Sequence, residues 1–464
     1  MQRTLTKDTI NQVGKTVLLQ GWLHSIRSHG KITFIDLRDR SGLVQVVSEN
    51  LTQDLKPESV VAITGKVAKR PEKLVNPKLL SGTVEIQAEK IEVISLSREL
   101  PLPINTDGHE IDETVRLKYR YLDLRRPRLN QIIRTRSKMV KFIRDYLTKE
   151  DFVEIETPIL TKTTPEGARD FLVPSRLQPG NFYALPQSPQ QYKQLLMVAG
   201  FERYFQIARC FRDEDPRHDR AYGEFTQLDM EMSFVTQNDI LELVEAMFTA
   251  MVKTVFPNKK ISQTPWPRIS HKEAIKKYHS DKPDLRKDKT NPDELAFTWI
   301  VDFPLFNEQT EADFFHGAGK NAKFAPSHHM FTSPHPDDVK LLDTNPLKVR
   351  GLQHDLVLNG YEVGGGSIRI HDPKIQSKVF ELIGFTKEQE KQFEHMLTAF
   401  TYGVPPHGGI APGIDRLLMV LFNEPSLREV IAYPAVASGQ TAVVNAPSPA
   451  SPEQLRELHL QIVK

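Results

Sequence analysis

The sequence predicts a protein of two unlike domains, a small N-terminal β-barrel followed by a larger domain of the α+β class. Three observations support this prediction. The length of 464 residues exceeds that of one ordinary domain. Five segments between residues 13 and 95 have apolar residues that alternate or cluster as in β-strands, with turn residues between the segments. From residue 131 the apolar residues recur instead at helical spacing, so the kind of structure changes.

Composition narrows the class of protein. Hydrophobic residues make up 39% and charged residues 26%, which is typical of a folded globular protein and not of a disordered or collagen-like one. The sequence has no apolar run near the ~20 residues that cross a bilayer, and its first residues lack the apolar core of a signal peptide. We therefore expect a cytoplasmic protein without a membrane partner. Cys210 is the one cysteine, which excludes an internal disulfide and any zinc site built from several thiolates.

The net charge of +2 means that a nucleic-acid partner would have to bind a local patch of the protein. The barrel is the first candidate, because barrels of this size often bind single-stranded nucleic acid on one face. The side chains suited to such a face are Trp22, Arg27, Phe34, Arg38 and Gln45. Trp22 and Phe34 have a second interpretation as core residues, since large aromatic side chains are mostly buried.

The sequence divides the chain into three parts. Residues 1–100 form the barrel domain, residues 101–125 a linker that begins in the Pro-rich stretch ELPLPINTDG, and residues 126–464 the second domain. The elements expected in the second domain are helices from 131, near 188–200 and at 238–255, β segments at 203–215 and 224–234, and a strand running into an apolar helix at 408–422. Residues 281–296 are polar and rich in turn formers, so we expect a surface excursion there.

The segment FRDED (211–215) places Arg212 and Glu214 directly after an apolar strand. An arginine presents a planar fork of donors that suits a phosphate, and a carboxylate two residues later lies on the same face of the strand. The two side chains could therefore bind different parts of one nucleotide. The alternative is a surface ion-pair network.

The segment YEVGGGSIRIH (361–371) carries Glu362 before three glycines and Arg369 after them. Successive glycines let a backbone approach a ligand closely, although a glycine run is also typical of a turn. The segment is neither a P-loop nor a GxGxxG motif. Asp355 lies seven residues before Glu362 and could join it as an oxygen ligand for Mg²⁺.

Three separated segments together resemble the three motifs of a class II aminoacyl-tRNA synthetase. They are FVEIETPIL (152–160), the region from FRDED to EFTQLDMEMSF (211–234) and GIAPGIDR (409–416). Within that class, stretches such as RYLDLRRP, TPEGARDFLVPSR, HHMFTSP and NGYEVGGGSIRIH resemble the aspartyl-tRNA synthetases of the bacterial type, over nearly the whole chain. The resemblance implies an anticodon-binding OB-fold barrel and a class II catalytic domain built on an antiparallel sheet flanked by helices.

The same resemblance implies a ligase that activates L-aspartate with ATP and transfers it to the 3′ end of tRNA-Asp. By similarity, Arg212 binds the α-phosphate, Arg416 the γ-phosphate end and Glu214 the base or ribose region, and these three residues are the catalytic set. The further residues implied for ATP are Phe225, stacked on adenine, Gln227 and Glu362. Glu362 and Asp355 would hold Mg²⁺.

The resemblance also implies an amino-acid pocket. In it Arg369 and Lys193 face the side-chain carboxylate of the substrate, which separates aspartate from the isosteric amide of asparagine by charge. The other pocket residues implied are Ser188, Gln190 and Asp229 at the α-amino end, Glu166 on a mobile loop and His328 beside the substrate.

On the barrel, the residues implied for the tRNA anticodon are Arg27, His29, Phe34, Gln45, Lys73, Asn76 and Glu85. His29 is typical of members that charge both tRNA-Asp and tRNA-Asn, whereas Lys73 favours strict discrimination, so both specificities stay open. Class II enzymes of this type pair through the first motif, and we expect a homodimer on that ground.

Four departures from the family pattern stand out. Asp151 replaces a usual glycine before the first motif, and Pro412 replaces a large apolar residue in the third, where it puts strand pairing in doubt. The stretch DRAYGEF (219–225) is one residue longer than the usual loop. At 281–300, where bacterial members carry an inserted domain, only a short link remains.

Two other functions remain as alternatives. One is a synthetase-like paralogue that binds RNA or aspartate without charging tRNA, which would be marked by loss of key side chains. The residues whose loss would mark it are Arg212, Glu214, Glu362, Arg369 and Arg416, and all are present. The other is an asparaginyl-specific enzyme, which should not need both Lys193 and Arg369.

Overall fold

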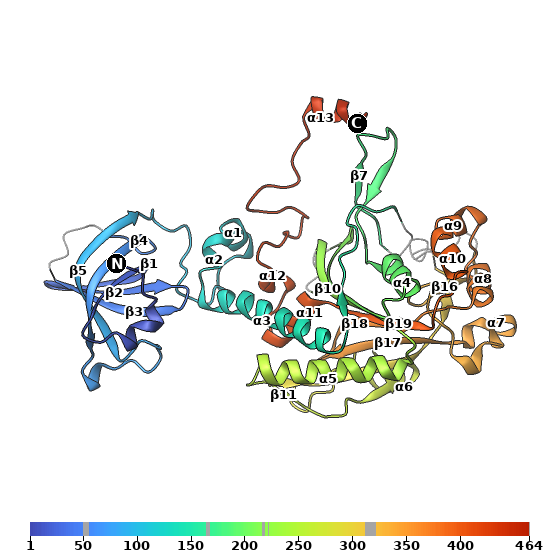
Figure 1. Cartoon of the computed structure of the whole chain (residues 1–464), viewed down its shortest axis with the longest axis horizontal. Helices are drawn as coiled ribbons and strands as arrows, with labels where there is room; N and C mark the ends of the chain where they lie inside the picture. Colours follow the sequence, from blue (N-terminus) through green and yellow to red (C-terminus); the bar gives the residue numbers. More distant parts are fainter. Residues whose placement is uncertain (50–54, 164–167, 216–218, 221, 311–321, 464) are drawn as a thin grey trace. The chain divides into compact units, whose positions relative to one another are not determined.

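The computed structural model describes residues 1–49, 55–163, 168–215, 219–220, 222–310 and 322–463 (Figure 1). The chain divides into two compact units, Met1–Pro103 and Ile104–Lys464, and each is described by itself. Within the described ranges, no helix combines the length and the apolar character needed to cross a bilayer.

The first unit is a closed five-stranded barrel with the strand order β1-β2-β3-β5-β4. Its elements are η1 (Thr6–Asn11), β1 (Thr16–His29), β2 (Ile32–Asp39), β3 (Gly42–Glu49), β4 (Val60–Lys69), η2 (Glu72–Leu74) and β5 (Val84–Ser95). Every second residue of these strands points into the core, as the alternating sequence predicts. Leu19, Leu23, Ile35 and Leu37 are examples, each at most 1% exposed.

Trp22 and Phe34 lie on the outside of this barrel and not in its core. Both are half-buried, and each falls between inward-pointing neighbours on its strand. Strand pairing sets Arg27 opposite Phe34, and Arg38 opposite Trp22. The outer face of β1 and β2 therefore presents alternating aromatic and basic side chains.

The second unit is built on an eight-stranded sheet with the order β12-β14-β17-β18-β19-β10-β9-β6. Its strands are β6 (Val153–Glu154), β9 (Arg203–Arg212), β10 (Gly223–Ser233), β12 (Arg268–Ser270), β14 (Phe297–Pro304), β17 (Arg350–Leu358), β18 (Tyr361–Ile368) and β19 (His407–Pro412). Neighbours are antiparallel except at the two edges, where β12 with β14 and β6 with β9 run parallel. The α+β class and the mainly antiparallel sheet are confirmed.

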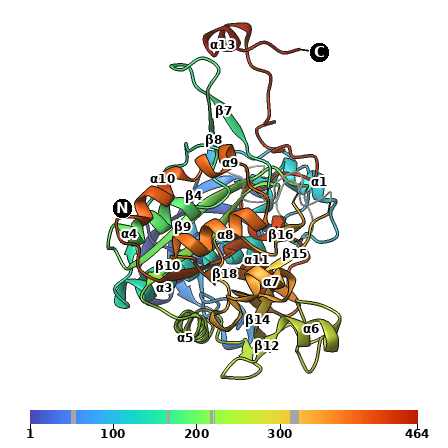
Figure 2. The same cartoon turned by 90° about the vertical axis from the view of Figure 1, so that its right-hand side faces the viewer.

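Helices cover one face of this sheet. The helices whose apolar residues share the main core with the strands are α3 (Pro127–Lys149), α5 (Gln237–Val255) and α11 (Ile414–Phe422). Figure 1 and Figure 2 show α5 running beneath the strands, with α4 (Gln190–Val198) on the other side. In β10 the even positions Leu228, Met230 and Met232 pack into that core. The odd positions point away from it, and they supply the polar side chains of the candidate site.

The remaining elements connect and flank this sheet. They are α1 (Glu113–Lys118), α2 (Arg120–Asp123), β7 (Leu172–Pro174), β8 (Phe182–Ala184), β11 (Lys260–Ile261), α6 (His271–Tyr278), β13 (Glu294–Leu295), β15 (Phe306–Glu308), β16 (Phe324–Pro326), η4 (Pro336–Asp338), α7 (Leu341–Thr344), η5 (Pro346–Lys348), α8 (Pro373–Leu382), α9 (Lys387–Lys391), α10 (Glu394–Phe400), α12 (Leu427–Val430) and α13 (Pro452–Glu457).

Two departures noted in the sequence leave the local fold intact. Asp151 follows α3 with φ of 61°, so it adopts the left-handed conformation that a glycine takes easily at a helix end. Pro412, where strand pairing was in doubt, is the last residue of β19 and pairs with Gly364 of β18. A Cβ at position 364 would come within 2.9 Å of the Pro412 Cα, and the glycine therefore makes room for the proline.

Two expected segment boundaries need correction. The linker at 101–125 is wrong over most of its length, because the second unit begins at Ile104 and residues 113–123 form α1 and α2. Arg120 in this stretch is fully buried and forms an ion pair with Asp123. The many charged residues of the stretch gave no sign of this burial. The link expected at 281–300 ends earlier, since β13 begins at Glu294 and β14 at Phe297.

Candidate active site

Four charged side chains meet on the polar face of the sheet. Asp229 and Glu231 project from β10, Lys193 from α4, and Arg369 follows β18. Lys193 Nζ donates to Asp229 Oδ1 at 2.7 Å and lies 3.3 Å from Glu231 Oε2. Arg369 donates to both oxygens of Glu231, from Nε at 3.0 Å and Nη2 at 3.3 Å. All four are at most 3% exposed, so two cations and two anions share one desolvated cluster.

The two carboxylates of this cluster respond differently to burial. Burial would raise the pKa of Glu231, but the charges of Arg369 and Lys193 outweigh it and bring the pKa to about 2. Burial raises the pKa of Asp229 by more than the charge of Lys193 lowers it, so this pKa is above its usual value. Its Oδ2 has no hydrogen-bond partner among the described residues. A buried carboxylate oxygen left open in this way fits a bound ammonium group.

Arg369 keeps part of its guanidinium for a ligand. Nε and Nη2 form a fork on Glu231, and Nη1 donates to Ser367 Oγ at 2.7 Å. A guanidinium carries five N–H donors, so one N–H on each terminal nitrogen remains beyond these three bonds. Two parallel N–H groups are suited to a second carboxylate. Glu231, which the sequence did not single out, thus orients the arginine.

Two other residues expected in the amino-acid pocket lie at the N-terminal end of α4, the helix that carries Lys193. Gln190 is buried at the start of α4 and donates from Nε2 to Gln194 Oε1 at 3.0 Å, and Ser188 lies half-buried just before that helix. Glu166 lies outside the described residues.

His328 joins the amino-acid pocket to the rest of the site. Although part of its surface is exposed, desolvation by its neighbours and then the charge of Arg369 lower its pKa to about 4, so the ring is neutral at pH 7. Glu362, Lys193 and Arg212 also act on it. The expected cations at 193, 212 and 369 therefore lie within electrostatic range of one imidazole.

At the nucleotide end, Arg212 closes β9 and Phe225 lies on β10. The Arg212 guanidinium carbon lies 5.0 Å from the centre of the Phe225 ring, and Nε faces the Gln187 carbonyl at 3.4 Å. Glu214 forms an ion pair with Arg220 at 2.9 Å. The hairpin thus places a cation, an aromatic face and a carboxylate next to each other, which can hold a phosphate and a base.

Gln227 is two residues further along β10. Its Oε1 accepts a hydrogen bond from Cys210 Sγ at 3.2 Å, and its Nε2 faces the Ala411 carbonyl at 3.5 Å. In the structure its contacts are therefore made with the neighbouring strands.

Asp355 and Glu362 lie together on β17 and β18. A Cβ built on Gly365 would be 3.2 Å from Asp355 Oδ1 and 3.8 Å from Glu362 Oε1, so both carboxylates flank the same glycine. Burial and then the charge of Glu362 raise the pKa of Asp355 well above its usual value. Two adjoining carboxylates that repel each other fit a divalent cation with oxygen ligands.

Arg416 reaches this carboxylate pair from α11. Its Nη1 donates to the Glu362 carbonyl at 2.7 Å, and its Nε donates to the Asp219 carbonyl at 3.0 Å. These contacts hold the third-motif arginine beside Glu362 of β18.

On the barrel, five of the expected anticodon residues share the outer face. Arg27 lies opposite Phe34, and Gln45 lies opposite Glu85 and donates to it at 3.2 Å. His29 packs edge-on against Phe34 with ring centres 6.0 Å apart. Lys73 and Asn76 lie in the β4–β5 connection, on η2 and just after it.

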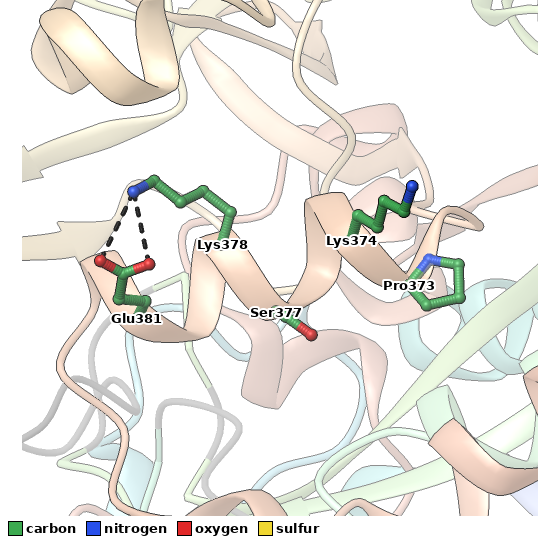
Figure 3. Close-up of a pocket in the computed structure, with 5 residues that line it drawn as sticks. All are labelled: Pro373, Lys374, Ser377, Lys378 and Glu381. Atoms are coloured by element: carbon green, nitrogen blue, oxygen red, sulfur yellow. Dashed lines mark hydrogen bonds and ion pairs between the residues drawn. The ribbon is translucent and has the colours of Figure 1, made fainter.

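A separate surface hollow of about 460 Å³ lies along α8, away from these charged clusters. Its side chains are Pro373, Lys374, Ser377, Lys378 and Glu381 (Figure 3). All come from one helix, and Lys378 pairs with Glu381 and Asp343, so the hollow is explained as a solvated helix face.

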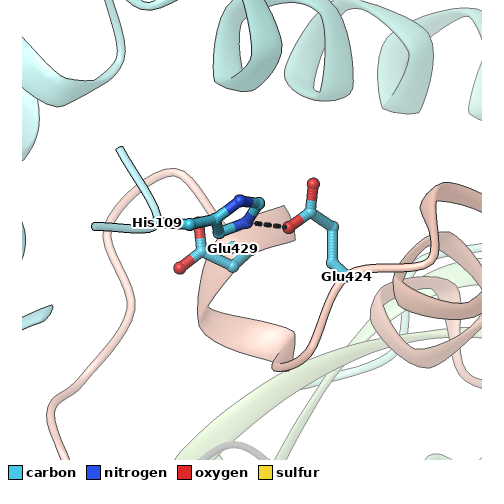
Figure 4. Close-up of side chains that lie close together, drawn as sticks. All are labelled: His109, Glu424 and Glu429. Atoms are coloured by element: carbon cyan, nitrogen blue, oxygen red, sulfur yellow. Dashed lines mark hydrogen bonds and ion pairs between the residues drawn. The ribbon is translucent and has the colours of Figure 1, made fainter. Parts of the chain in front are cut away.

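His109, Glu424 and Glu429 have ligand atoms within 4.8 Å of one another (Figure 4). Their carboxylates are already neutralised by arginines. Glu429 accepts two hydrogen bonds from Arg116, at 2.6 and 3.0 Å, and one from Arg128 at 2.8 Å. This arrangement is a structural ion network that ties α12 to α1 and α3.

Comparison with known proteins agrees with this geometry. A family model described as "tRNA synthetases class II (D, K and N)" matches residues 112–437, and one described as "OB-fold nucleic acid binding domain" matches residues 17–94. The chain belongs to the class II tRNA synthetases.

Curated relatives of this synthetase are similar over nearly their whole length. One is an aspartate–tRNA(Asp/Asn) ligase of Rubrobacter xylanophilus, 40% identical, with 97% of this chain and 95% of the relative covered. Another is an aspartate–tRNA ligase of Geobacillus kaustophilus, 40% identical, with 97% of each covered. The first alignment runs over 583 positions, 119 more than the 464 residues of this chain, so the relative has residues without a counterpart here.

A solved structure supports the fold alone. The asparaginyl-tRNA synthetase of Pyrococcus horikoshii complexed with asparaginyl-adenylate superposes with a TM-score of 0.74 at 23% identity, covering 94% of this chain and 98% of that one.

Proposed function

We propose that this synthetase is an aspartate–tRNA ligase that joins L-aspartate to the 3′ end of tRNA-Asp and of tRNA-Asn. The observation that supports it most strongly is the buried cluster around Glu231. There Lys193 and Arg369 are held on one sheet face by carboxylates, with free guanidinium N–H groups left for a ligand carboxylate. The Rubrobacter and Geobacillus relatives are both named as aspartate–tRNA ligases, and the Rubrobacter name includes both tRNA-Asp and tRNA-Asn.

The reaction brings two anions together. An oxygen of the aspartate α-carboxylate attacks the α-phosphorus of ATP, an O–P bond forms, and pyrophosphate leaves with the electrons of the broken bond. Arg212 neutralises the α-phosphate and Arg416 the far phosphates, while Phe225 stacks on adenine and Glu214 contacts the base or ribose. In the second step the terminal ribose hydroxyl of tRNA attacks the aspartyl carbonyl and AMP leaves. Catalysis is therefore by positioning and charge neutralisation, without a protein nucleophile.

The amino-acid pocket would read both ends of aspartate. The open oxygen of Asp229 accepts hydrogen bonds from the ammonium group, near Ser188 and Gln190. The free N–H groups of Arg369, with Lys193, donate to the side-chain carboxylate. Glu362 and Asp355 would hold Mg²⁺, whose charge, when bound, offsets the phosphates.

Aspartate is expected to be the one amino acid that supports ATP–pyrophosphate exchange. The amide of asparagine would turn its NH₂ group toward the donors of Arg369 and Lys193, and an unsatisfied buried charged donor costs about 3 kcal/mol, or roughly 100-fold in kcat/KM. The measurement is exchange with each of the twenty standard amino acids in turn. Exchange with asparagine as fast as with aspartate would contradict the specificity, and exchange with none would contradict the ligase.

Both tRNA-Asp and tRNA-Asn are expected to be aspartylated, with kcat/KM values within about tenfold of each other. An enzyme that recognised the differing anticodon base strongly would lose about 1–3 kcal/mol with the wrong tRNA, and a relaxed enzyme loses less. The support is His29 against Phe34 on the barrel face, together with the "Asp/Asn" in the name of the Rubrobacter relative. Aspartylation of two transcripts that differ only in the anticodon measures it. A preference above about 100-fold for tRNA-Asp would show strict discrimination.

We also propose a homodimer paired through the first motif. Apolar side chains of that segment are exposed in the single chain, with Val153 43%, Ile159 47% and Leu160 52% exposed. A patch of this kind is typical of an interface. The proposed reaction places the enzyme in the cytoplasm, with the tRNA that it charges.

A further inference from the structure

The polar link before β13 reaches into the candidate site. Lys282 Nζ lies 2.9 Å from Glu362 Oε2, with side chains 41% and 31% exposed. The backbone of the link is fixed at the same place, because a Cβ built on Gly360 would lie 3.4 Å from the Asp284 Cβ and 3.8 Å from the Lys282 carbonyl oxygen. Gly360, in the β17–β18 turn two residues before Glu362, has a φ of 87°. The link thus packs against the turn that carries Glu362.

Lys282 differs from the other nearby cations in bonding a side-chain carboxylate of the Glu362–Asp355 pair. Arg416 donates to the Glu362 carbonyl, and Asp355 accepts from Gln353 Nε2 at 3.3 and 3.4 Å. Within the described part of the chain, Lys282 is the one cation with an ion pair to this carboxylate pair, and it bonds Glu362. It therefore occupies an oxygen that a divalent cation would need.

We propose that Lys282 is a displaceable counter-ion of Glu362, which compensates the Glu362–Asp355 pair until a divalent cation takes its place. This inference rests on the proposed function, which assigns the pair to the metal. An ammonium group and a metal ion compete for the same carboxylate oxygen, so Lys282 weakens metal binding in the absence of nucleotide. The flexible four-carbon stem of a lysine lets the ammonium withdraw without moving the backbone. Lys282 is a positioning residue and takes no part in bond making.

The test is binding of Mn²⁺ to the full chain without nucleotide, measured from the electron paramagnetic resonance of free Mn²⁺. Lys282→Met is expected to bind Mn²⁺ about five- to tenfold more tightly, as removal of one partly exposed counter-charge implies. Lys282→Arg keeps the charge, and Lys287→Met removes an exposed lysine of the same link. Both should match the wild type within about twofold. Equal affinity in all variants, including none detectable, overturns the proposal.

A second readout follows the lysine itself. Competitive labelling with acetic anhydride should acetylate Lys282 several-fold faster when Mn²⁺ is saturating, while Lys287 is unaffected. Unchanged labelling of Lys282 would show that the ammonium is not displaced. Wild-type pyrophosphate exchange, measured in parallel, separates the two claims: exchange with unchanged Mn²⁺ affinity and labelling removes only the role of Lys282, whereas absence of exchange removes the ligase.

Discussion

Arg369→Lys is expected to lower kcat/KM for aspartate in pyrophosphate exchange about 100-fold. The guanidinium bonds Glu231 through two nitrogens and Ser367 through the third, and still has N–H groups for the substrate. A lysine keeps the charge but has one nitrogen, so it cannot hold Glu231 and a substrate carboxylate in the same fixed geometry. Loss of a charge-assisted hydrogen bond of about 3 kcal/mol corresponds to the expected factor.

The matched control is Arg350→Lys. Arg350 also grips a carboxylate with a fork, Asp338 at 2.7 and 3.1 Å, but it is partly exposed and outside the candidate site. Exchange by this variant should stay within about twofold of wild type. The KM for aspartate should rise in Arg369→Lys while the KM for ATP changes little. An unchanged KM for aspartate would remove Arg369 from the amino-acid pocket.

The sequence could predict which segments form the sheet, because the periods of apolar residues are local properties. In β10 the alternation of Leu228, Met230 and Met232 with polar residues already assigns one face to the core and the other to Asp229. Arg212, Arg369 and Arg416 could also be predicted as site residues, because the motifs that contain them can be recognised in a single sequence. In the structure Arg212 ends β9, Arg369 follows β18, and Arg416 on α11 donates to the Glu362 carbonyl of β18.

Partners between distant segments could not be predicted. Glu231 is 138 positions from Arg369, and Lys282 is 80 positions from Glu362, so only strand order and link path bring them together. The alternation of β10 does give one usable signal, because Glu231 is on the same face as Asp229. Lys282 offered none, as its polar surroundings are those of any surface link.

The sequence also did not predict which charged side chains are buried. Residues 113–123 were assigned to the linker that begins in the stretch ELPLPINTDG, which is rich in proline and turn formers. Arg120 is instead fully buried, bonded to Asp123 at 2.8 Å and to backbone carbonyls of 428–432. Its carbonyl partners come from the other end of the catalytic unit, so the local sequence could not reveal the burial.

Glu429→Gln is expected to lower the free energy of unfolding of the catalytic unit by about 3 kcal/mol at pH 7. Burial would raise the pKa of Glu429, but Arg116 and Arg128 outweigh it and bring the pKa from 4.5 to about 2. A depression of this size corresponds to about 3 kcal/mol of stability, the lower end of the effect of breaking a buried ion pair. Glutamine keeps the shape but leaves both guanidinium groups facing a neutral amide.

The pH dependence gives the sharper test of Glu429, because a carboxylate with a depressed folded pKa stabilises above its unfolded pKa and loses that contribution as pH falls toward the folded one. The difference between wild type and Glu429→Gln should therefore be full above pH 5 and shrink between pH 4.5 and about 2. Unfolding in guanidinium chloride can be followed by Trp266 and Trp299 in a Trp22→Phe background, which silences the barrel. Glu453→Gln, which breaks an exposed pair with Arg456, should change stability by less than about 1 kcal/mol. A difference that stays constant with pH would mean that packing, and not the charge of Glu429, stabilises this network.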